Sequence, residues 1–328
     1  MTRGKIAFLT APLLYLAVAV LCLLVGPAAL TPREIWAGLV GEDPTAHAIL
    51  FALRLPRLLA ALLSGTALSV AGVLLQGTLG NSLASPNTVG VNAGAGLFAV
   101  LCLALFPHAA PFLAPVAFLG AVAALGLILL LSRFAGGGSS TLILGGVAVT
   151  AFFGAGISAV TVLCPDVFAD YAAFSVGSLG GVGMEELPLP AVLTLLGTAA
   201  AFFLAPTVDA LSLGDGVASS LGVSVKRWRT VLLLLACLLA ASSVALSGLL
   251  GFVGLIVPHA ARLLVGQKTR RQVVLAPLLG GILVASADLV GRCAFVPSEM
   301  PVGVLLAFLG APVFAALLIG RRRRNAHD

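Results

Sequence analysis

Long apolar runs follow one another along almost the whole of this sequence, and they constrain the fold more than any other feature. A helix needs about 20 residues to cross a bilayer. Ten runs are candidate spans, some of them short or interrupted by Pro and Gly: 6–25, 57–79, 91–106, 111–132, 141–163, 189–208, 230–248, 251–265, 272–294 and 301–320. The sequence therefore predicts an all-α polytopic membrane protein, a single transmembrane domain over 1–328 with about ten transmembrane helices.

The composition supports this fold class. The 328 residues are 60% hydrophobic and only 9% charged, whereas a soluble domain is about 25% charged. The 38 glycines favour helices that pack closely through small residues over the alternating strands of a β-barrel. A soluble enzyme, a disordered chain and a nucleic-acid-binding domain are excluded, and we expect no nucleic acid partner.

Basic residues concentrate on one side of the predicted membrane. With both termini cytoplasmic, thirteen of the 18 Lys and Arg residues lie inside: Arg3, Lys5, Arg133, Lys226, Arg227, Arg229, Lys268, Arg270, Arg271, Arg321, Arg322, Arg323 and Arg324. Because cytoplasmic loops carry an excess of Lys and Arg, this orientation is expected. The run 6–25 is longer than the apolar core of a signal peptide, about 7–15 residues, so we favour a retained helix over a cleaved leader.

An amphipathic stretch lies in the longest inner connection, the segment 209–225. Leu213, Val217 and Leu221 recur every four residues and fall on one helical face. Such a helix either lies on lipid or inserts into a groove of a cytoplasmic partner. The segment contains no Lys or Arg, which disfavours adsorption to anionic lipid.

Three other features have two interpretations each. Arg54 and Arg57 flank Pro56 on the outer side, where they either bind lipid headgroups or dock an acidic partner. The polar connector 77–94 is either a turn or the lining of a cavity. Asp288 lies within a predicted span, either as a hydrogen-bonding group between helices or as part of an ion pathway.

Five segments in the same order and spacing resemble the FecCD-type permeases, which are membrane subunits of type II ABC importers for iron–siderophores, haem and vitamin B12. The segments are Arg54-Leu55-Pro56-Arg57, 81–94, 211–223, 251–263 and 300–312. The resemblance covers most of the chain. One departure is Gly80-Asn81-Ser82, where the family usually has a basic residue before Asn-Pro.

The resemblance implies a homodimer of ten-span subunits in the bacterial cytoplasmic (inner) membrane. Two ATP-binding subunits would dock on the cytoplasmic side, and a periplasmic or lipid-anchored substrate-binding protein on the other, with membrane lipid around the helices. This subunit would have no catalytic residue, metal or cofactor of its own, because ATP and Mg²⁺ belong to the partner ATPase. The sequence accordingly contains no phosphate-binding loop of the G-x-x-x-x-G-K-[ST] type.

The same resemblance assigns three groups of residues. Coupling to the ATPase is implied for Ser212, Leu213, Gly214, Asp215, Val217, Ala218, Leu221 and Gly222 in the cytoplasmic coupling segment 209–225. A cytoplasmic gate is implied for Ser139, Ser140 and Thr141, which follow the glycines 136–138. Docking of the binding protein is implied for Arg54, Arg57 and Arg292.

The function expected from these observations is that of a permease subunit of a binding-protein-dependent ABC importer for a metal chelate. Iron–siderophore is the first choice, with haem and a cobalamin-type corrinoid as alternatives. The alternative function is an ion-coupled secondary transporter, which Asp288 alone supports. An intramembrane enzyme finds no support, because no Ser/His pair, paired Asp or His/Glu cluster stands at catalytic spacing. A Cys164–Cys293 disulfide is left open.

Overall fold

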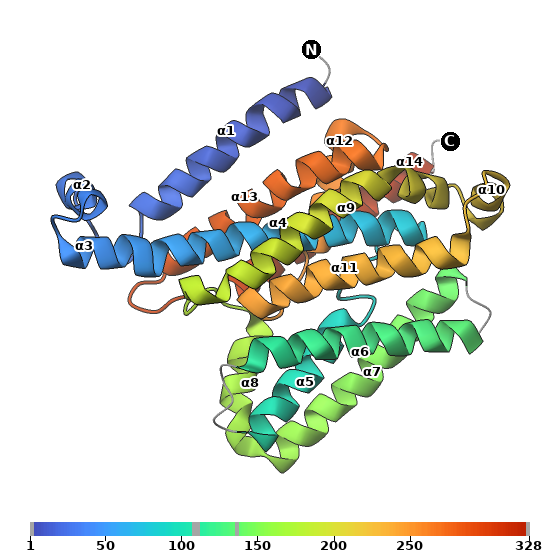
Figure 1. Ribbon diagram of the computed structural model, residues 1–328, viewed down its shortest axis with the longest axis horizontal. Coiled ribbons are helices and arrows are strands. Elements are labelled where there is room, and N and C mark those ends of the chain that lie inside the picture. The colour runs from blue at the N-terminus through green and yellow to red at the C-terminus, as the bar shows by residue number, and fades with distance from the viewer. Residues whose placement is uncertain (1–2, 107–111, 135–137, 326–328) are drawn as a thin grey trace.

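The computed structural model describes residues 3–106, 112–134 and 138–325, and every regular element in these ranges is helical (Figure 1). The elements are α1 (Arg3–Leu24), α2 (Pro32–Val40), α3 (Pro44–Ala48), the π-helical turn η1 (Ile49–Arg54), α4 (Leu55–Leu79), α5 (Val91–Leu105), α6 (Leu113–Phe134), α7 (Ser139–Leu163), the 3-10 turn η3 (Pro165–Val167), α8 (Phe168–Val176), the 3-10 turn η4 (Met184–Glu186), α9 (Pro188–Ser212), α10 (Asp215–Ser220), α11 (Val225–Ser247), α12 (Val253–Val265), α13 (Thr269–Cys293) and α14 (Val302–Asn325).

Within the described ranges, seven helical segments are long and apolar enough to cross a membrane. They are Gly4–Leu24, Pro44–Leu79, Leu113–Phe134, Ser139–Leu163, Met184–Ser212, Val225–Ser247 and Thr269–Cys293. Three shorter apolar helices accompany them, Val91–Leu105, Val253–Val265 and Val302–Ala316. Each of the ten apolar runs in the sequence thus contains a helix, although the first residue of the run 111–132 lies outside the described residues. The predicted class, an all-helical membrane protein, is confirmed.

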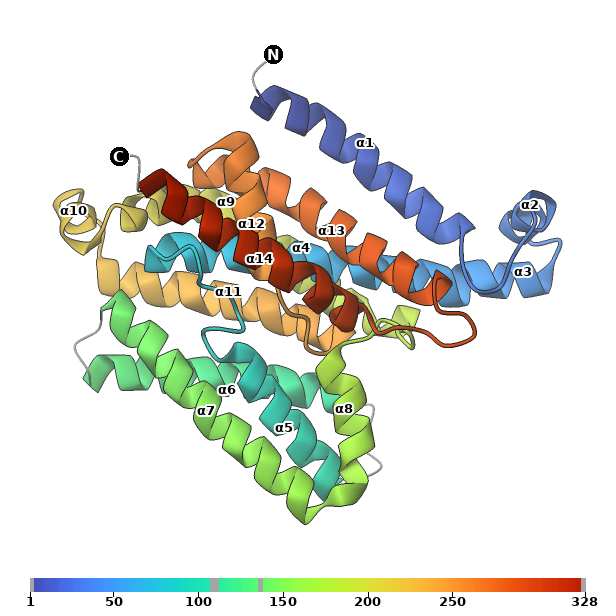
Figure 2. The same ribbon diagram turned by 180° about the vertical axis from the view of Figure 1, so that it is seen from behind.

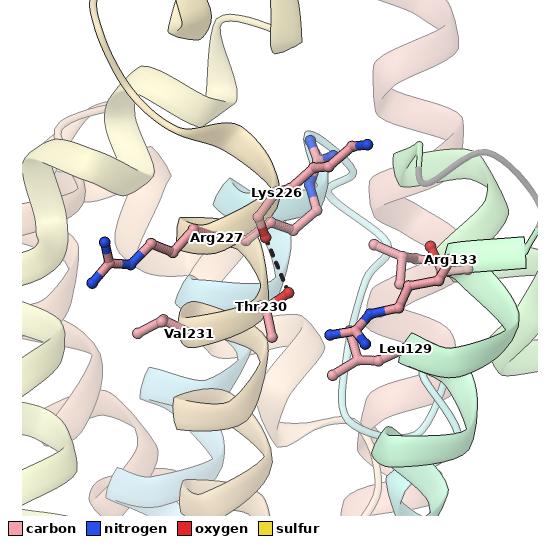
Figure 3. Close-up of a pocket in the computed structure, with 9 residues that line it drawn as sticks. Leu129, Arg133, Lys226, Arg227, Thr230 and Val231 are labelled. Carbon is pink, nitrogen blue, oxygen red and sulfur yellow. Dashed lines mark hydrogen bonds between the residues drawn. The ribbon is translucent and has the colours of Figure 1, made fainter.

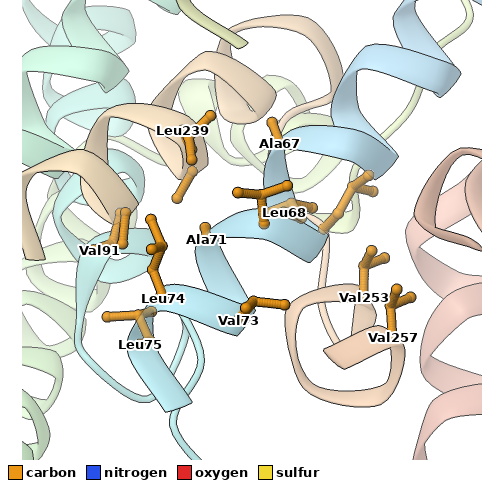
Figure 4. Close-up of a cluster of buried hydrophobic side chains, with 14 of the residues drawn as sticks. Ala67, Leu68, Ala71, Val73, Leu74, Leu75, Val91, Leu239, Val253 and Val257 are labelled. Atoms are coloured by element: carbon orange, nitrogen blue, oxygen red, sulfur yellow. The ribbon is translucent and has the colours of Figure 1, made fainter. Parts of the chain in front are cut away.

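Helix α4 lies at the centre of the molecule (Figure 1), in contact with α13, α11, α9 and α12. Its apolar side chains are buried on all sides, which is why its sequence is a nearly continuous apolar run rather than a one-sided stripe. Leu68 and Leu74 of α4 belong to the same buried cluster as Leu239 of α11 and Val257 of α12 (Figure 4). This arrangement makes α4 the helix against which most of the others are positioned.

Glycines allow the central helices to approach closely. A Cβ atom added at Gly65 of α4 would overlap the main-chain carbonyl of Gly280 of α13, and one added at Gly280 would overlap that of Gly65. Membrane helices gain little from burying apolar surface against each other, so close van der Waals packing through small residues stabilises their association. Gly65 and Gly280 are thus examples of the close helix packing that the high glycine content predicted.

The molecule has two layers and two distinct ends. Helices α5, α6, α7 and α8 form a second layer beside α11, and α14 crosses in front of α12 and α13 in the view of Figure 2 and also contacts α8. We call the end that carries α10, the start of α11 and the end of α6 the α10 end, and the end that carries α2 and α3 the opposite end (Figure 1). The first residues of α1 and the last residues of α14 point toward the α10 end.

Candidate functional site

The predicted coupling segment folds into a short exposed helix at the α10 end. Leu213, Val217 and Leu221 have exposed fractions of 61%, 47% and 62%, whereas Ala218 is buried. Gly214 and Gly222 have positive φ angles of 99° and 80°, in the region that favours glycine, and these residues turn the chain into and out of α10. All three apolar side chains are exposed, but only Val217 lies within α10, because Gly214 interrupts the helix after Leu213 and Leu221 follows the last helical residue. The helix is therefore shorter than the predicted face of three residues.

Arg229 fixes α10 to the first turns of α11. Its Nη1 and Nη2 atoms donate to the two carboxylate oxygens of Asp215 at 3.1 and 2.5 Å. This hydrogen bonding from the Arg229 guanidinium lowers the pKa of the Asp215 carboxyl. Because a paired fork restricts both position and angle, α10 is attached rigidly to α11. Asp215 is one of the predicted coupling residues, but Arg229 could not be predicted, because its spacing of 14 residues from Asp215 gives no local signal.

A second polar contact fixes the preceding helix. The Asp209 carboxylate in α9 accepts a hydrogen bond of 2.9 Å from the Thr269 main-chain N–H at the start of α13. A carboxylate at this point also stabilises the positive end of the α13 dipole. The coupling segment is thus connected on one side to α11 through Arg229 and on the other to α13 through Asp209.

The three predicted gate residues form the first turn of α7 rather than a loop. Ser139 and Thr141 are partly buried and Ser140 is exposed, and Gly138 precedes them in an extended conformation. The predicted gate glycines 136 and 137 lie outside the described residues. The turn belongs to the α10 end (Figure 1), the same end as the coupling segment.

At the opposite end, Arg54 and Arg292 donate hydrogen bonds to main-chain carbonyls at and just after the C-terminal end of α1. Arg54 donates to the main-chain carbonyls of Leu23, Leu24 and Ala28 at 2.7, 2.8 and 2.5 Å. Arg292 donates to the Cys22 carbonyl at 2.5 Å. The last carbonyls of a helix have no partner within the helix and carry partial negative charge, so a cation is stabilising there. Both side chains are buried, which differs from the exposed positions that docking on another protein requires.

Arg57 forms ion pairs with one buried and one exposed carboxylate. Its Nη2 atom lies 2.9 Å from Oδ1 of Asp288 in α13, and its Nη1 atom lies 2.8 Å from Oε2 of Glu299. Arg292 adds a weaker contact, 3.8 Å from Asp288. The structure thus brings Arg57 and Arg292 together around Asp288. Arg54 lies nearby, because it and Arg292 both bind carbonyls at the end of α1. Their docking role stays a prediction, and Asp288 is engaged as a group that connects helices.

The cysteine pairing that the sequence left open is not formed. Cys164 and Cys293 are both free thiols, as are Cys22, Cys102 and Cys237. Disulfides therefore do not connect the described helices, and α1, α4 and α13 are joined at the opposite end by the hydrogen bonds and ion pairs of the three arginines.

The sequence and structure of the chain both match known transport proteins. The model of the FecCD transport family matches residues 13–320. The chain is 36% identical to the Fe(3+)-citrate import system permease protein YfmE of Bacillus subtilis, over 98% of this chain and 97% of that protein. It is 38% identical to the vitamin B12 import system permease protein BtuC of Vibrio cholerae, over 93% and 91%.

Two further comparisons agree with these. The hemin transport system permease protein HmuU of Yersinia pestis is 36% identical over 84% of each chain. The solved structure of a metal-chelate type ABC transporter in an inward-facing conformation has a TM-score of 0.87 and 30% identity, and covers 96% of this chain and 99% of that one. Family model, relatives and fold agree along nearly the full length, and the chain belongs to the FecCD transport family of ABC transporter permeases.

Proposed function

We propose that this protein is the permease subunit of a binding-protein-dependent importer that moves a metal chelate across the bacterial cytoplasmic membrane, driven by ATP hydrolysis in a separate subunit. The relatives are named for iron citrate, vitamin B12 and hemin, which supports a bulky chelate as the substrate class. An iron–siderophore is our first choice, with haem and cobalamin-type corrinoids as alternatives. The observation that carries the proposal is the segment around α10, in which Leu213, Val217 and Leu221 are exposed and Arg229 attaches α10 to α11.

The proposal includes a membrane topology. Ten helices cross the bilayer, α1, α4, α5, α6, α7, α9, α11, α12, α13 and α14, and both termini are cytoplasmic. Support comes from the positions of the basic residues, since Arg133, Lys226, Arg227, Arg270 and Arg271 all belong to helix ends at the α10 end (Figure 1). The α10 end is then cytoplasmic, where an ATPase subunit reaches Leu213, Val217 and Leu221.

The contacts of α10 provide a route from the ATPase to the gate. A displacement of α10 moves the start of α11, because Arg229 and Asp215 connect the two helices. Helix α11 packs on α6, and α6 packs on α7. The first turn of α7 contains Ser139, Ser140 and Thr141, so movement of α10 reaches these residues through packed helices. In a homodimer, two copies of this turn meeting at the axis would close the pathway with small side chains.

An ion-coupled secondary transporter is not favoured. Coupling to an ion gradient needs an ionisable group that releases and takes up the ion during transport. Asp288, the candidate for that role, is buried and bonded to Arg57. The curated relatives are permeases of ABC importers, and these observations together support ATP as the energy source.

The substrate-binding protein is proposed to dock at the opposite end. Arg57 is the most accessible of the three predicted docking residues, with 14% of its side chain accessible beside Glu299, whereas Arg54 and Arg292 are buried. We expect Arg57→Gln to weaken the affinity of the reconstituted permease complex for the binding protein, and Arg33→Gln, on the exposed helix α2, to leave it unchanged. Exposed ion pairs contribute only about 0–1 kcal/mol, so a severalfold change is expected. Equal affinities would remove Arg57 from the docking surface.

Uptake by the assembled complex tests the proposed function. The permease, its ATPase and its binding protein are reconstituted in proteoliposomes, and uptake of a ferric siderophore, haem and cobalamin is measured in parallel. We expect uptake of one chelate class that requires both ATP and the binding protein. Uptake that follows an ion gradient without ATP would overturn the proposal.

A further inference from the structure

A basic cleft lies at the α10 end, between α6, α7 and α11 (Figure 3). Its volume is about 540 Å³, within the range of about 300–1,000 Å³ that is typical of small-molecule sites. Arg133 extends from α6 into the gap toward α11, where Lys226 and Thr230 lie, whereas Arg227 and Val231 point away from α6 (Figure 3). Four basic residues line the cleft: Arg133, Lys226, Arg227 and Arg229.

The positive charge of this cleft is only partly compensated within the chain. Arg229 is paired with Asp215, and no carboxylate is among the residues that line the cleft. In the described ranges of the chain, Arg133, Lys226 and Arg227 take part in none of the ion pairs, which involve Arg57, Arg229 and Arg292. Among the described residues, these three cations of the cleft therefore have no carboxylate partner.

The start of α11 adds to this charge. The N-terminal end of a helix carries partial positive charge and favours acidic residues. Here the first turn contains no acid and includes Lys226 and Arg227, and the preceding Ser224 makes no side-chain capping hydrogen bond. This arrangement is unfavourable on its own, and an anion bound between α6 and α11 would offset it.

Apolar side chains continue from the cleft toward the middle of the helices. Leu129 of α6 and Val231 of α11 line the cleft itself. Leu130 lies three residues before Arg133 in α6 and Leu234 four residues after Thr230 in α11, so each shares a helix face with a residue that lines the cleft. Both leucine side chains are exposed. A ligand that matches both parts has an anionic group at the helix ends and hydrocarbon along the helices, which a carboxylate from a protein partner does not provide.

We propose that this cleft binds the phosphate group of an anionic phospholipid such as phosphatidylglycerol, with an acyl chain along Leu130 and Leu234. Basic pockets between membrane helices on the cytoplasmic side bind lipid headgroups of this class. The site adjoins Leu142 of α7 and the pair between Arg229 and Asp215. A bound lipid therefore contacts the same helices that we propose to connect the ATPase to the gate.

Trp228 provides a direct probe of the site. The chain has two tryptophans. Trp228 lies in the first turn of α11, between the cleft residues Arg227 and Arg229 in the sequence, whereas Trp36 lies on α2 at the opposite end. In the full-length Trp36→Phe protein, the fluorescence therefore reports on α11 alone. We expect brominated phosphatidylglycerol in mixed micelles to quench it at a severalfold lower mole fraction than brominated phosphatidylcholine. Equal quenching by the two lipids would overturn the proposal.

Charge removal tests the named residues. In the Trp36→Phe background, Arg133→Gln with Lys226→Gln should reduce the preference for phosphatidylglycerol by roughly fivefold for each charge. The charge-conserving pair Arg133→Lys with Lys226→Arg should keep it, which separates binding from a folding defect. The matched control is Lys268→Gln with Arg271→Gln, in a second basic surface at the α10 end, and it should also keep the preference.

Two other ligands of the cleft, a soluble anion and an acidic protein surface, would give different results in these experiments. Displacement of the brominated phosphatidylglycerol by inorganic phosphate would assign the cleft to a soluble anion and contradict the proposal. An unchanged lipid preference in Arg133→Gln with Lys226→Gln, together with weaker retention of the ATPase subunit, would assign it to an acidic protein surface and contradict the proposal as well. These readouts need no transport, so they stand or fall separately from the proposed import function.

Discussion

Arg57 and Asp288 are 231 residues apart in the sequence, and the Arg57 Nε atom lies 3.0 Å from both carboxylate oxygens of Asp288. The pair joins the start of α4 to the last turns of α13, the two helices whose glycines bring their backbones together near Gly65 and Gly280. Asp288 is 4% exposed. The pairing with Arg57 therefore explains why Asp288, an acidic residue, lies inside an apolar run.

Removal of Asp288 should destabilise the permease. Asp288→Ala leaves Arg57 with only its exposed partner Glu299, and the loss of one member of a buried pair costs about 3–5 kcal/mol. We expect a clear decrease in the midpoint of thermal unfolding of the purified permease in detergent. The double variant Arg57→Met with Asp288→Leu, which removes both charges, should recover much of the loss. An Asp288→Ala midpoint equal to that of the wild type would contradict the structural role.

Replacement of Arg54 should loosen the end of α1. Arg54→Lys keeps the charge but loses the planar fork that reaches the carbonyls of Leu23, Leu24 and Ala28. Amide hydrogen exchange over 25–31 should therefore become faster, while exchange in the buried helix α4 stays slow. Arg33→Lys on α2 is the matched control, because its side chain is exposed. Identical exchange in wild type and Arg54→Lys would show that these hydrogen bonds do not order the segment.

The attachment of α10 should be independent of pH near neutrality. Hydrogen bonds from Arg229 lower the pKa of the Asp215 carboxyl in the folded protein. The stabilisation is therefore fully present above the unfolded value of about 3.9, and it is lost as the pH falls through the lower folded value. A spin label at Val217 should keep the same mobility from neutral to mildly acidic pH, and Asp215→Asn should increase that mobility at neutral pH. Mobility that changes near neutrality would contradict this attachment.

The proposed gate should change its spacing with the nucleotide state. Ser139 and Ser140 lie in the first turn of α7 at the end that carries α10, so two copies can meet in a dimer. Cysteines at these positions in the reconstituted complex should cross-link between subunits in one nucleotide state and not in another. Cross-linking of equal yield in every state would argue against a gating role.

The coupling segment and the outer arginines differ in how far the sequence could predict them. Leu213, Val217 and Leu221 show a local period, and a period of four residues indicates a helix face without knowledge of the rest of the fold. Arg54 binds main-chain carbonyls of α1, which have no sequence signature, and the partner of Arg57 lies in a helix far along the chain. Charge, predicted side and family resemblance thus suggested an external partner for arginines that have partners within the chain.

The turns between helices were equally hard to predict. The π-helical turn Ile49–Arg54 leads directly into α4, and the short helices α2, α3 and α8 lie outside the apolar runs. Apolar periodicity identifies helices that contact lipid or the core, but it gives little signal for short elements at helix ends. The Thr31 capping box at the start of α2, with Glu34 three residues later, is a local signal that could have identified that helix.

Coupling through α10 is the central claim, and one substitution tests it most directly. Leu221→Asp places a charge among the three exposed apolar residues Leu213, Val217 and Leu221, directly after the end of α10. Ser219→Asp places the same charge within α10, outside these three residues. In proteoliposomes that contain the complete transporter, ATP hydrolysis and chelate uptake are measured together. We predict that Leu221→Asp abolishes uptake and the stimulation of ATP hydrolysis by the loaded binding protein, whereas Ser219→Asp retains both. The claim would be contradicted if Leu221→Asp takes up as much chelate for each ATP hydrolysed as the wild type does.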